Sequence, residues 1–180
     1  ITILVDGKVF LSGWFLSEIY DPVADLWSPV GEPKRKDLAR GTTATVLNDG
    51  TVFMVGGARF PPNTWQGDVS NPVANTEIYN PSDGSLSTST NMSKSRQNHS
   101  AVLLANGDVL VIGGTSMESY NPATEIWTEA GSLIHERDEM HTATMLGDDR
   151  ILIVGGNKNT SGAAMLSAEA ALRVGTGSVK

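Results

Sequence analysis

Apolar and polar positions alternate in short runs along the chain, and turn residues separate the runs. Residues 42–57, TTATVLNDGTVFMVGG, are typical: an apolar run, a turn pair and a second apolar run. Asp49 and Gly50 form the turn pair, and Asp-Gly accepts the positive φ angles of a two-residue β-turn. The second run is β-branched and almost continuously apolar, which is typical of a strand buried on both faces. The stretch therefore predicts a β-hairpin.

This hairpin pattern recurs with a fixed spacing. Residues 99–114 read HSAVLLANGDVLVIGG and residues 141–156 read HTATMLGDDRILIVGG, while residues 6–11 carry a shorter version. The period lies in the low forties once a long insertion in the second copy is set aside. A period of this size indicates a repeat architecture built from similar units.

A third and a fourth strand are predicted in the first three units. A Glu-x-Tyr-x-Pro motif occupies residues 18–22, 77–81 and 118–122. The Asp-Pro or Asn-Pro pair turns the chain, and a large apolar residue follows seven positions after each Tyr. These apolar residues are Trp27, Leu86 and Trp127. We expect four antiparallel strands per unit, with the Tyr and Trp side chains in the core.

Paired glycines after the second strand, Tyr in the third and a large apolar residue in the fourth resemble the kelch repeat. The residue pattern is most similar to that of the kelch units of galactose-oxidase-type proteins. The resemblance implies an all-β β-propeller whose blades are four-stranded antiparallel sheets packed against their neighbours. It covers residues 1–180 as one domain, with blades at roughly 1–39, 40–95, 96–136 and 137–180.

The fourth unit departs from the motif, since Ala171 replaces the Tyr and Ser178 stands in the place of Trp. Residues 163–173 are rich in Ala and are also compatible with a short helix. The repeat predicts a strand at residues 168–174, and this is the interpretation we favour.

About four blades are present, whereas propellers of this family usually close with six or seven. We expect a partial ring that is continued by further chain or completed by self-association, with a four-bladed ring as the remaining alternative. The chain begins with Ile1 rather than Met, which suggests a processed product or a part of a longer protein. An open set of blades exposes two apolar faces and therefore requires a partner.

Composition and charge narrow the range of partners. The chain has no Cys and a net charge of −7. Without Cys, neither a disulfide framework nor a Cys-based metal site is expected. An acidic surface repels phosphate, so we expect no nucleic-acid partner. No run of about 18 apolar residues occurs, so we expect no membrane span.

The long insertion of the second unit is the first candidate for a binding site. It reads ARFPPNTWQGDVSNPVANT at residues 58–76 and contains Arg59, Phe60, Trp65 and Gln66. Loops on a rigid scaffold often carry function, and an exposed Trp beside amide side chains suits a sugar or a peptide. The alternative interpretation, which we weigh more heavily, is that Phe60 and Trp65 pack the loop onto its own blade.

Recurring basic residues before the first strand are the second candidate. Arginines precede it in the second, third and fourth units: Arg40, Arg96 and Arg137. His99 and His141 occupy matching places, where the second unit has Thr42. A ring of such residues can bind a carboxylate or an acidic peptide. Recurrence also fits a purely structural role, because every unit needs the same packing and hydrogen bonds.

Catalytic and metal motifs are missing from the sequence. Residues 135–141, HERDEMH, do not match H-E-x-x-H, and neither a nucleophile motif G-x-S-x-G nor a Cys is present. Galactose-oxidase-type enzymes, which the repeat resembles, use copper and a tyrosine crosslinked to cysteine. That crosslink needs a Cys, so we predict no cofactor, no metal and no catalytic residue in this chain.

The leading hypothesis is a non-catalytic kelch propeller that binds a protein or a glycan through its interblade loops and the loops between strands two and three. Two alternatives are the propeller portion of a galactose- or glyoxal-oxidase-like copper enzyme and a structural or adhesive surface protein. The resemblance slightly favours an extracellular or cell-surface location.

Overall fold

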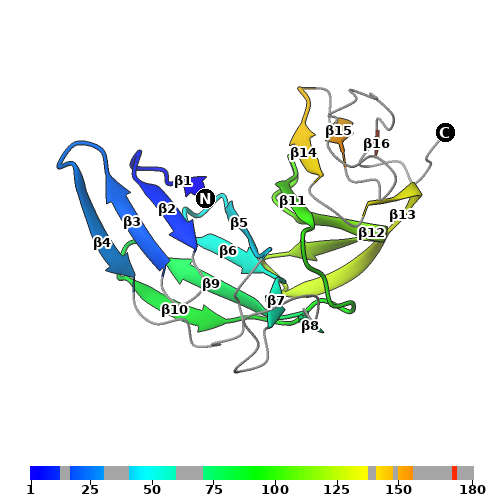
Figure 1. Ribbon diagram of the computed structural model, residues 1–180, viewed down its shortest axis with the longest axis horizontal. Coiled ribbons are helices and arrows are strands. Elements are labelled where there is room, and N and C mark those ends of the chain that lie inside the picture. Colours follow the sequence, from blue (N-terminus) through cyan, green and yellow to red (C-terminus); the bar gives the residue numbers. More distant parts are fainter. Residues whose placement is uncertain are drawn as a thin grey trace, which may run out of the picture. The chain divides into compact units, whose positions relative to one another are not determined.

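The computed structural model describes residues 1–12, 17–30, 41–59, 71–137, 141–147, 150–155 and 172–173. In this part of the chain every regular element is a β-strand, and all paired strands are antiparallel (Figure 1). The chain divides into two compact units, Ile1–Gln97 and Asn98–Lys180. The predicted all-β antiparallel class is confirmed, whereas the number of blades and their closure into a ring stay predictions.

The first sheet is a four-stranded meander, as the repeat predicts. Its strands follow in the order β1-β2-β3-β4: β1 (Thr2–Ile3), β2 (Val9–Ser12), β3 (Ser17–Asp21) and β4 (Leu26–Val30). Gly7 in the β1–β2 turn has a φ of 84°, which is why the turn pair needs glycine. The register aligns Ile3 with Val9, Val9 with Tyr20 and Tyr20 with Trp27 across the sheet.

The second sheet is also four-stranded and contains the long insertion. Its order is β10-β9-β6-β5: β5 (Thr43–Val46), β6 (Val52–Val55), β9 (Thr76–Asn80) and β10 (Ser85–Thr88). Between β6 and β9 the chain forms a separate two-stranded stem of β7 (Ala58–Arg59) and β8 (Asn71–Pro72). The insertion therefore begins and ends in paired backbone.

The core of the first unit contains residues from both of its four-stranded sheets. Phe10 is fully buried, and its ring stacks on Tyr79 with centroids 5.3 Å apart and planes 22° from parallel. Ile19 lies opposite Phe10 in the first sheet, and Val52 and Leu86 lie opposite Tyr79 in the second. These residues belong to one hydrophobic cluster. The period of two along each strand thus directs one apolar row of each sheet into a shared core.

The third sheet has fewer and longer strands than the first two. It has the order β11-β12-β13: β11 (Ser100–Leu103), β12 (Val109–Asn121) and β13 (Ile126–Arg137). β12 contains both Gly113 and Gly114, and it pairs first with β11 and then with β13. The Asn121 side chain nevertheless donates to Asp108 at 2.8 Å, whereas a straight strand of this length would place the two residues about 40 Å apart. The chain therefore reverses direction within β12, as the glycine pair predicts. In the second sheet both Gly56 and Gly57 have positive φ angles, whereas here only Gly114 does. Pairing with β13 begins at Gly114.

The fourth sheet has the order β14-β15-β16: β14 (Thr142–Met145), β15 (Arg150–Val154) and β16 (Leu172–Arg173). β16 pairs with β15 and lies inside the strand predicted at residues 168–174; the rest of that segment, apart from β16, lies outside the described residues. Ile151 and Ile153 are buried in a cluster with Leu110 and Ile112 of the third sheet. The second unit therefore also has a core shared between two sheets.

The repeated Tyr and Trp residues do not all have the same surroundings. Tyr20 contacts Trp27 and Tyr120 contacts Trp127, with ring centroids 5.1 and 5.0 Å apart. Tyr79 and Tyr120 are buried, as expected, but Trp27 is 49% exposed. Trp27 lies on the face of the first sheet opposite to Phe10, and the second sheet covers only the Phe10 side. The prediction that every repeat Trp is a core residue is therefore wrong for Trp27.

Candidate binding site

The stem β7–β8 holds the base of the insertion. Ala58 pairs with Pro72 and the main chain of Arg59 pairs with Asn71. Residues 60–70 lie outside the described residues, and with them Phe60, Trp65 and Gln66; Arg40 also lies outside them. The structure therefore fixes the two ends of the predicted binding loop. The contacts of its aromatic residues stay predictions.

Hydrogen bonds tie this stem to the segment that leads out of the second sheet. The N–H of Gly57 donates to the carbonyl of Arg96 at 2.8 Å, and the N–H of Arg96 donates to the carbonyl of Val73 at 3.1 Å. The N–H of Val73 in turn donates to the carbonyl of Gly57 at 2.9 Å. These bonds close a ring of three backbone links. Gly57 has a φ of 105°, a conformation that only glycine adopts without strain.

A second set of bonds continues along the same segment. The N–H of Met92 donates to Ala74 at 3.0 Å, and the hydroxyl of Thr76 donates to the carbonyl of Thr90 at 2.8 Å. Met92 and Thr76 are both buried. The returning end of the insertion is therefore held along its length. A loop whose base is fixed in this way loses less conformational entropy when a ligand orders it.

Two of the recurring arginines, Arg96 and Arg137, are buried, and the side chain of Arg137 contacts a main-chain group. Arg96 is 6% exposed and Arg137 is 9% exposed. The Nη1 of Arg137 donates to the carbonyl of Gly155. In the second sheet the hydroxyl of Thr42 donates to the carbonyl of Gly56 at 3.1 Å, and Gly56 is the repeat equivalent of Gly155. A polar side chain thus satisfies the carbonyl at the end of the second strand in both units.

His141 is held by the same kind of contact. It is 5% exposed, and its Nε2 lies 3.0 Å from the carbonyl oxygen of Ile112. A carbonyl can only accept, so Nε2 carries the proton. Burial lowers the pKa of His141, as does the positive charge of Arg137, while the bond to Ile112 opposes the shift. His141 is therefore neutral at pH 7. Its main-chain carbonyl accepts a 2.7 Å hydrogen bond from the hydroxyl of Ser100.

These contacts favour the structural interpretation of the recurring residues. Arg137 and His141 each use a side-chain nitrogen for a main-chain carbonyl of the sheet ends. Moving such a group toward a ligand leaves a buried carbonyl without its partner, which costs about 1–3 kcal/mol. A ligand-binding role of Arg96 and Arg137 stays a prediction.

Neither a metal site nor a membrane span emerges from the described residues. They contain no group of three or more His, Cys, Asp or Glu side chains that could hold a metal ion. A search of the same residues finds no helix with the length and hydropathy needed to cross a membrane.

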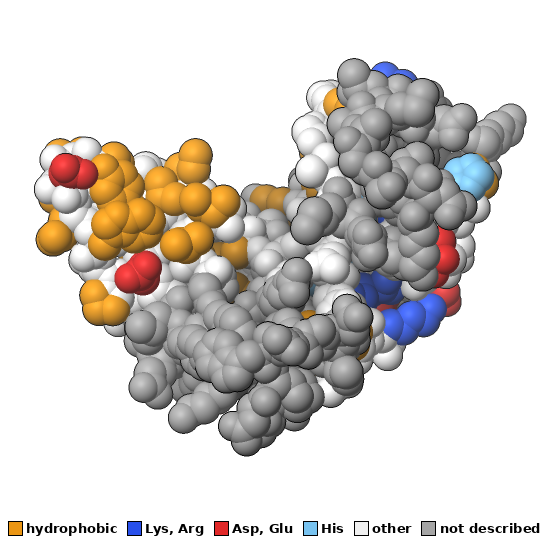
Figure 2. Space-filling model, viewed as in Figure 1, with side chains coloured by type: hydrophobic (Ala, Val, Ile, Leu, Met, Phe, Trp, Pro, Cys, Tyr) orange, Lys and Arg blue, Asp and Glu red, His pale blue; other side chains and the backbone are white. Residues whose placement is uncertain are grey.

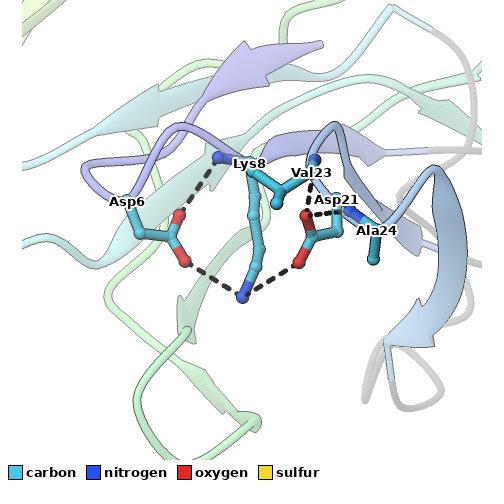
Figure 3. Close-up of polar contacts among 5 residues, drawn as sticks. All are labelled: Asp6, Lys8, Asp21, Val23 and Ala24. Atoms are coloured by element: carbon cyan, nitrogen blue, oxygen red, sulfur yellow. Dashed lines mark hydrogen bonds and ion pairs between the residues drawn. The ribbon is translucent and has the colours of Figure 1, made fainter.

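A polar contact that the sequence pattern did not predict joins two turns of the first sheet (Figure 3). Lys8 Nζ lies 3.2 Å from Asp6 and 3.8 Å from Asp21, which links the β1–β2 turn to the β3–β4 turn. Hydrogen bonds from the N–H groups of Ala24 and Val23 lower the pKa of Asp21. All three charged side chains are solvated, so the link orders the turns and contributes little to stability.

The third sheet makes the same link with different residues. Asn121 donates to Asp108 at 2.8 Å, and Asn106 donates to the other oxygen of Asp108 at 2.9 Å. The residue directly after the turn glycine thus contacts the second turn in both sheets. A polar residue at this place in the period was the sequence signal for the contact.

Comparison with known proteins agrees with the fold. No protein-family model matches the chain. A solved structure of a fungal alcohol oxidase of the AA5 family, in complex with copper, matches with a TM-score of 0.62 and 17% identity. The match covers 84% of this chain and 47% of the oxidase, so this chain spans about half the length of that protein. At this identity the similarity concerns the fold, which the chain shares with part of this oxidase.

Proposed function

We propose that the chain is a non-catalytic β-sheet scaffold that binds a glycan through the insertion at residues 58–76. The observation that carries the proposal is the hydrogen-bonded stem at the base of that insertion. Gly57, Val73 and Arg96 join the stem to the neighbouring segment through three backbone bonds. The longest departure from the repeat is thus held at a defined place on the sheet.

The composition of the loop supports a sugar ligand. Trp65 and Phe60 supply aromatic faces, on which the C–H groups of a sugar ring can stack. Gln66, with the neighbouring Asn63 and Asp68, supplies amide and carboxylate groups that can bond hydroxyls. A site of a few polar groups around an aromatic surface is typical of small-ligand recognition.

A glycan array of neutral and acidic oligosaccharides, followed by calorimetric titration of any sugar that binds, tests the proposal. The double variant Trp65→Ala with Arg59→Ala should weaken binding by about tenfold or more, as expected for loss of an aromatic anchor. Trp27→Phe is the matched control, because it removes an indole outside the insertion. Failure of every sugar to bind, or equal binding by the double variant, would show that the proposal is wrong.

A second candidate follows from the match to the AA5 alcohol oxidase. In this view the chain forms the sheet portion of a larger oxidase-like protein that holds copper. The residues described here do not fit that metal, because they contain no cluster of ligating side chains and the sequence has no Cys. We therefore assign no step to copper. Equilibrium dialysis of the chain against Cu(II) decides: one tightly held ion per chain would favour this candidate, and no retention would favour the scaffold.

A further inference from the structure

The first sheet presents an apolar face that none of the described residues of its own unit covers. The face contains the row Ile3, Val9, Tyr20 and Trp27, and we call this row the Trp27 face. Ile3 is 70% exposed and Trp27 is 49% exposed. Figure 2 shows hydrophobic side chains gathered over the part of the molecule that contains the first sheet. A soluble protein rarely leaves such a surface exposed unless it binds something.

The equivalent row of the second sheet is covered. It consists of Val46, Val52, Tyr79 and Leu86, which occupy the same places in the repeat. Tyr79 is 4% exposed and Leu86 is 7% exposed, because the Phe10 side of the first sheet packs on them. The second sheet therefore shows what the Trp27 face is shaped to receive. Its complement is the opposite face of another sheet of the same repeat.

That opposite face is incompletely covered on the fourth sheet. Leu152 takes the place of Phe10 in the period, and Thr144 lies opposite Leu152 in the register. Phe10 is fully buried and the equivalent Leu110 of the third sheet is 3% exposed. Leu152 is only partly buried, and Thr144 is exposed. We call the row of Thr142, Thr144, Leu152 and Val154 the Leu152 face.

We infer that a second copy of this chain docks with its Leu152 face on the Trp27 face. The contact between sheets inside each unit has this form, since Phe10 packs on Tyr79 in the first unit and Leu110 packs with Ile151 in the second. The exposed Trp27 face and the partly exposed Leu152 face are a complementary pair of the same kind.

The interface is heterologous, because two different faces meet. Such a contact either closes into a ring of copies or continues into a longer assembly. Two Trp27 faces, or two Leu152 faces, cannot form this contact, because the contact pairs one row of each kind. The inference is independent of the glycan site, which lies in the insertion of the second sheet.

Light scattering coupled to size exclusion, over a range of concentrations, tests self-association of the 180-residue chain. The chain should exceed its monomer mass of 19.1 kDa. Ile3→Glu and Leu152→Glu should each weaken self-association by about tenfold or more, because each buries a charge in an apolar contact. Thr144→Glu repeats the second test at an exposed position, where folding is not at risk. Val23→Glu, a charge on a 95% exposed turn residue, is the control and should leave the mass unchanged.

Mixing the variants separates this interface from a symmetric one. An Ile3→Glu chain keeps an intact Leu152 face, and a Thr144→Glu chain keeps an intact Trp27 face. Their mixture should therefore form a two-chain complex that neither variant forms alone. A wild-type chain that stays monomeric overturns the inference and assigns the Trp27 face to another protein or to further repeats. Self-association that responds to Ile3→Glu but not to Thr144→Glu and Leu152→Glu overturns it in favour of two Trp27 faces packed together.

Discussion

Leu86 and Leu26 offer a matched test of how burial stabilises the first unit. Each lies in the fourth strand of its sheet, Leu86 in β10 and Leu26 in β4. Leu86 is 7% exposed and belongs to the core that the two sheets share, whereas Leu26 is 59% exposed. Replacement by Ala removes the same atoms from both positions. The difference in stability between the two variants therefore reports burial.

The magnitude follows from the atoms removed. Leu→Ala deletes three carbon groups, and each buried group contributes about 0.8 kcal/mol to the free energy of unfolding. Nearly complete burial of Leu86 gives about 2 kcal/mol, and the cavity left beside Tyr79 raises the expected loss to about 3 kcal/mol. Leu26 is less than half buried and its loss leaves no cavity. We expect its replacement to cost about 1 kcal/mol or less.

Urea unfolding followed by tryptophan fluorescence measures this difference. Trp127 is the single tryptophan of the second unit, so a Trp127→Phe background confines the signal to the first. The midpoint should fall for Leu86→Ala with an unchanged slope, and remain close to the background protein for Leu26→Ala. Equal losses for the two variants, or a larger loss for Leu26→Ala, would refute the placement of the core between the two sheets.

Two further predictions concern a turn and a buried histidine. Gly7→Ala should lower the free energy of unfolding by about 1–2 kcal/mol, because φ is 84° and an added Cβ meets nothing within 4 Å. Gly147→Ala, which has equally open space and no positive φ, should change the urea midpoint little, and equal effects would contradict the backbone argument. For His141, the lowered pKa means that below about pH 6.5 the unfolded chain binds a proton that the folded chain does not, so stability falls as the pH drops. His141→Gln keeps an N–H for the Ile112 carbonyl but does not titrate. The loss of stability of this variant relative to the wild type should therefore shrink from pH 8 to pH 5.5. A difference that stays constant over this range would show that His141 does not titrate in this way.

The strands could be predicted because their signals are local. The turn pairs at Gly7 and Gly50 require positive φ angles, and both residues have a φ of 84°. Between such turns, the apolar runs leave little choice of register. The reversal predicted at Gly113 and Gly114 is supported by the contact between Asn121 and Asp108, which lie beside opposite ends of β12.

The exposure of repeated residues could not be predicted in the same way. Trp27 and Trp127 follow the same motif and make the same contact with a Tyr, yet Trp27 is half exposed. The motif specifies which face of a sheet a side chain lies on. Whether another sheet covers that face depends on what lies next to it, and a single unit of sequence does not contain this information.

The residues of the insertion are therefore better candidates for ligand binding than the residues that recur in every repeat. Each strand end has a carbonyl that needs a hydrogen-bond donor, and side chains at the recurring positions supply it. Thr42, Arg137 and His141 each bond such a carbonyl. A ligand that recruited them would have to compensate for buried carbonyls left without a partner. The insertion at residues 58–76 lies outside the repeat, and backbone bonds join its stem to the neighbouring segment, so the side chains between the two ends of the stem can vary without disturbing the sheets. Substitutions at Trp65 or Gln66 should therefore change binding without changing stability, whereas substitutions at Arg137 should change stability first.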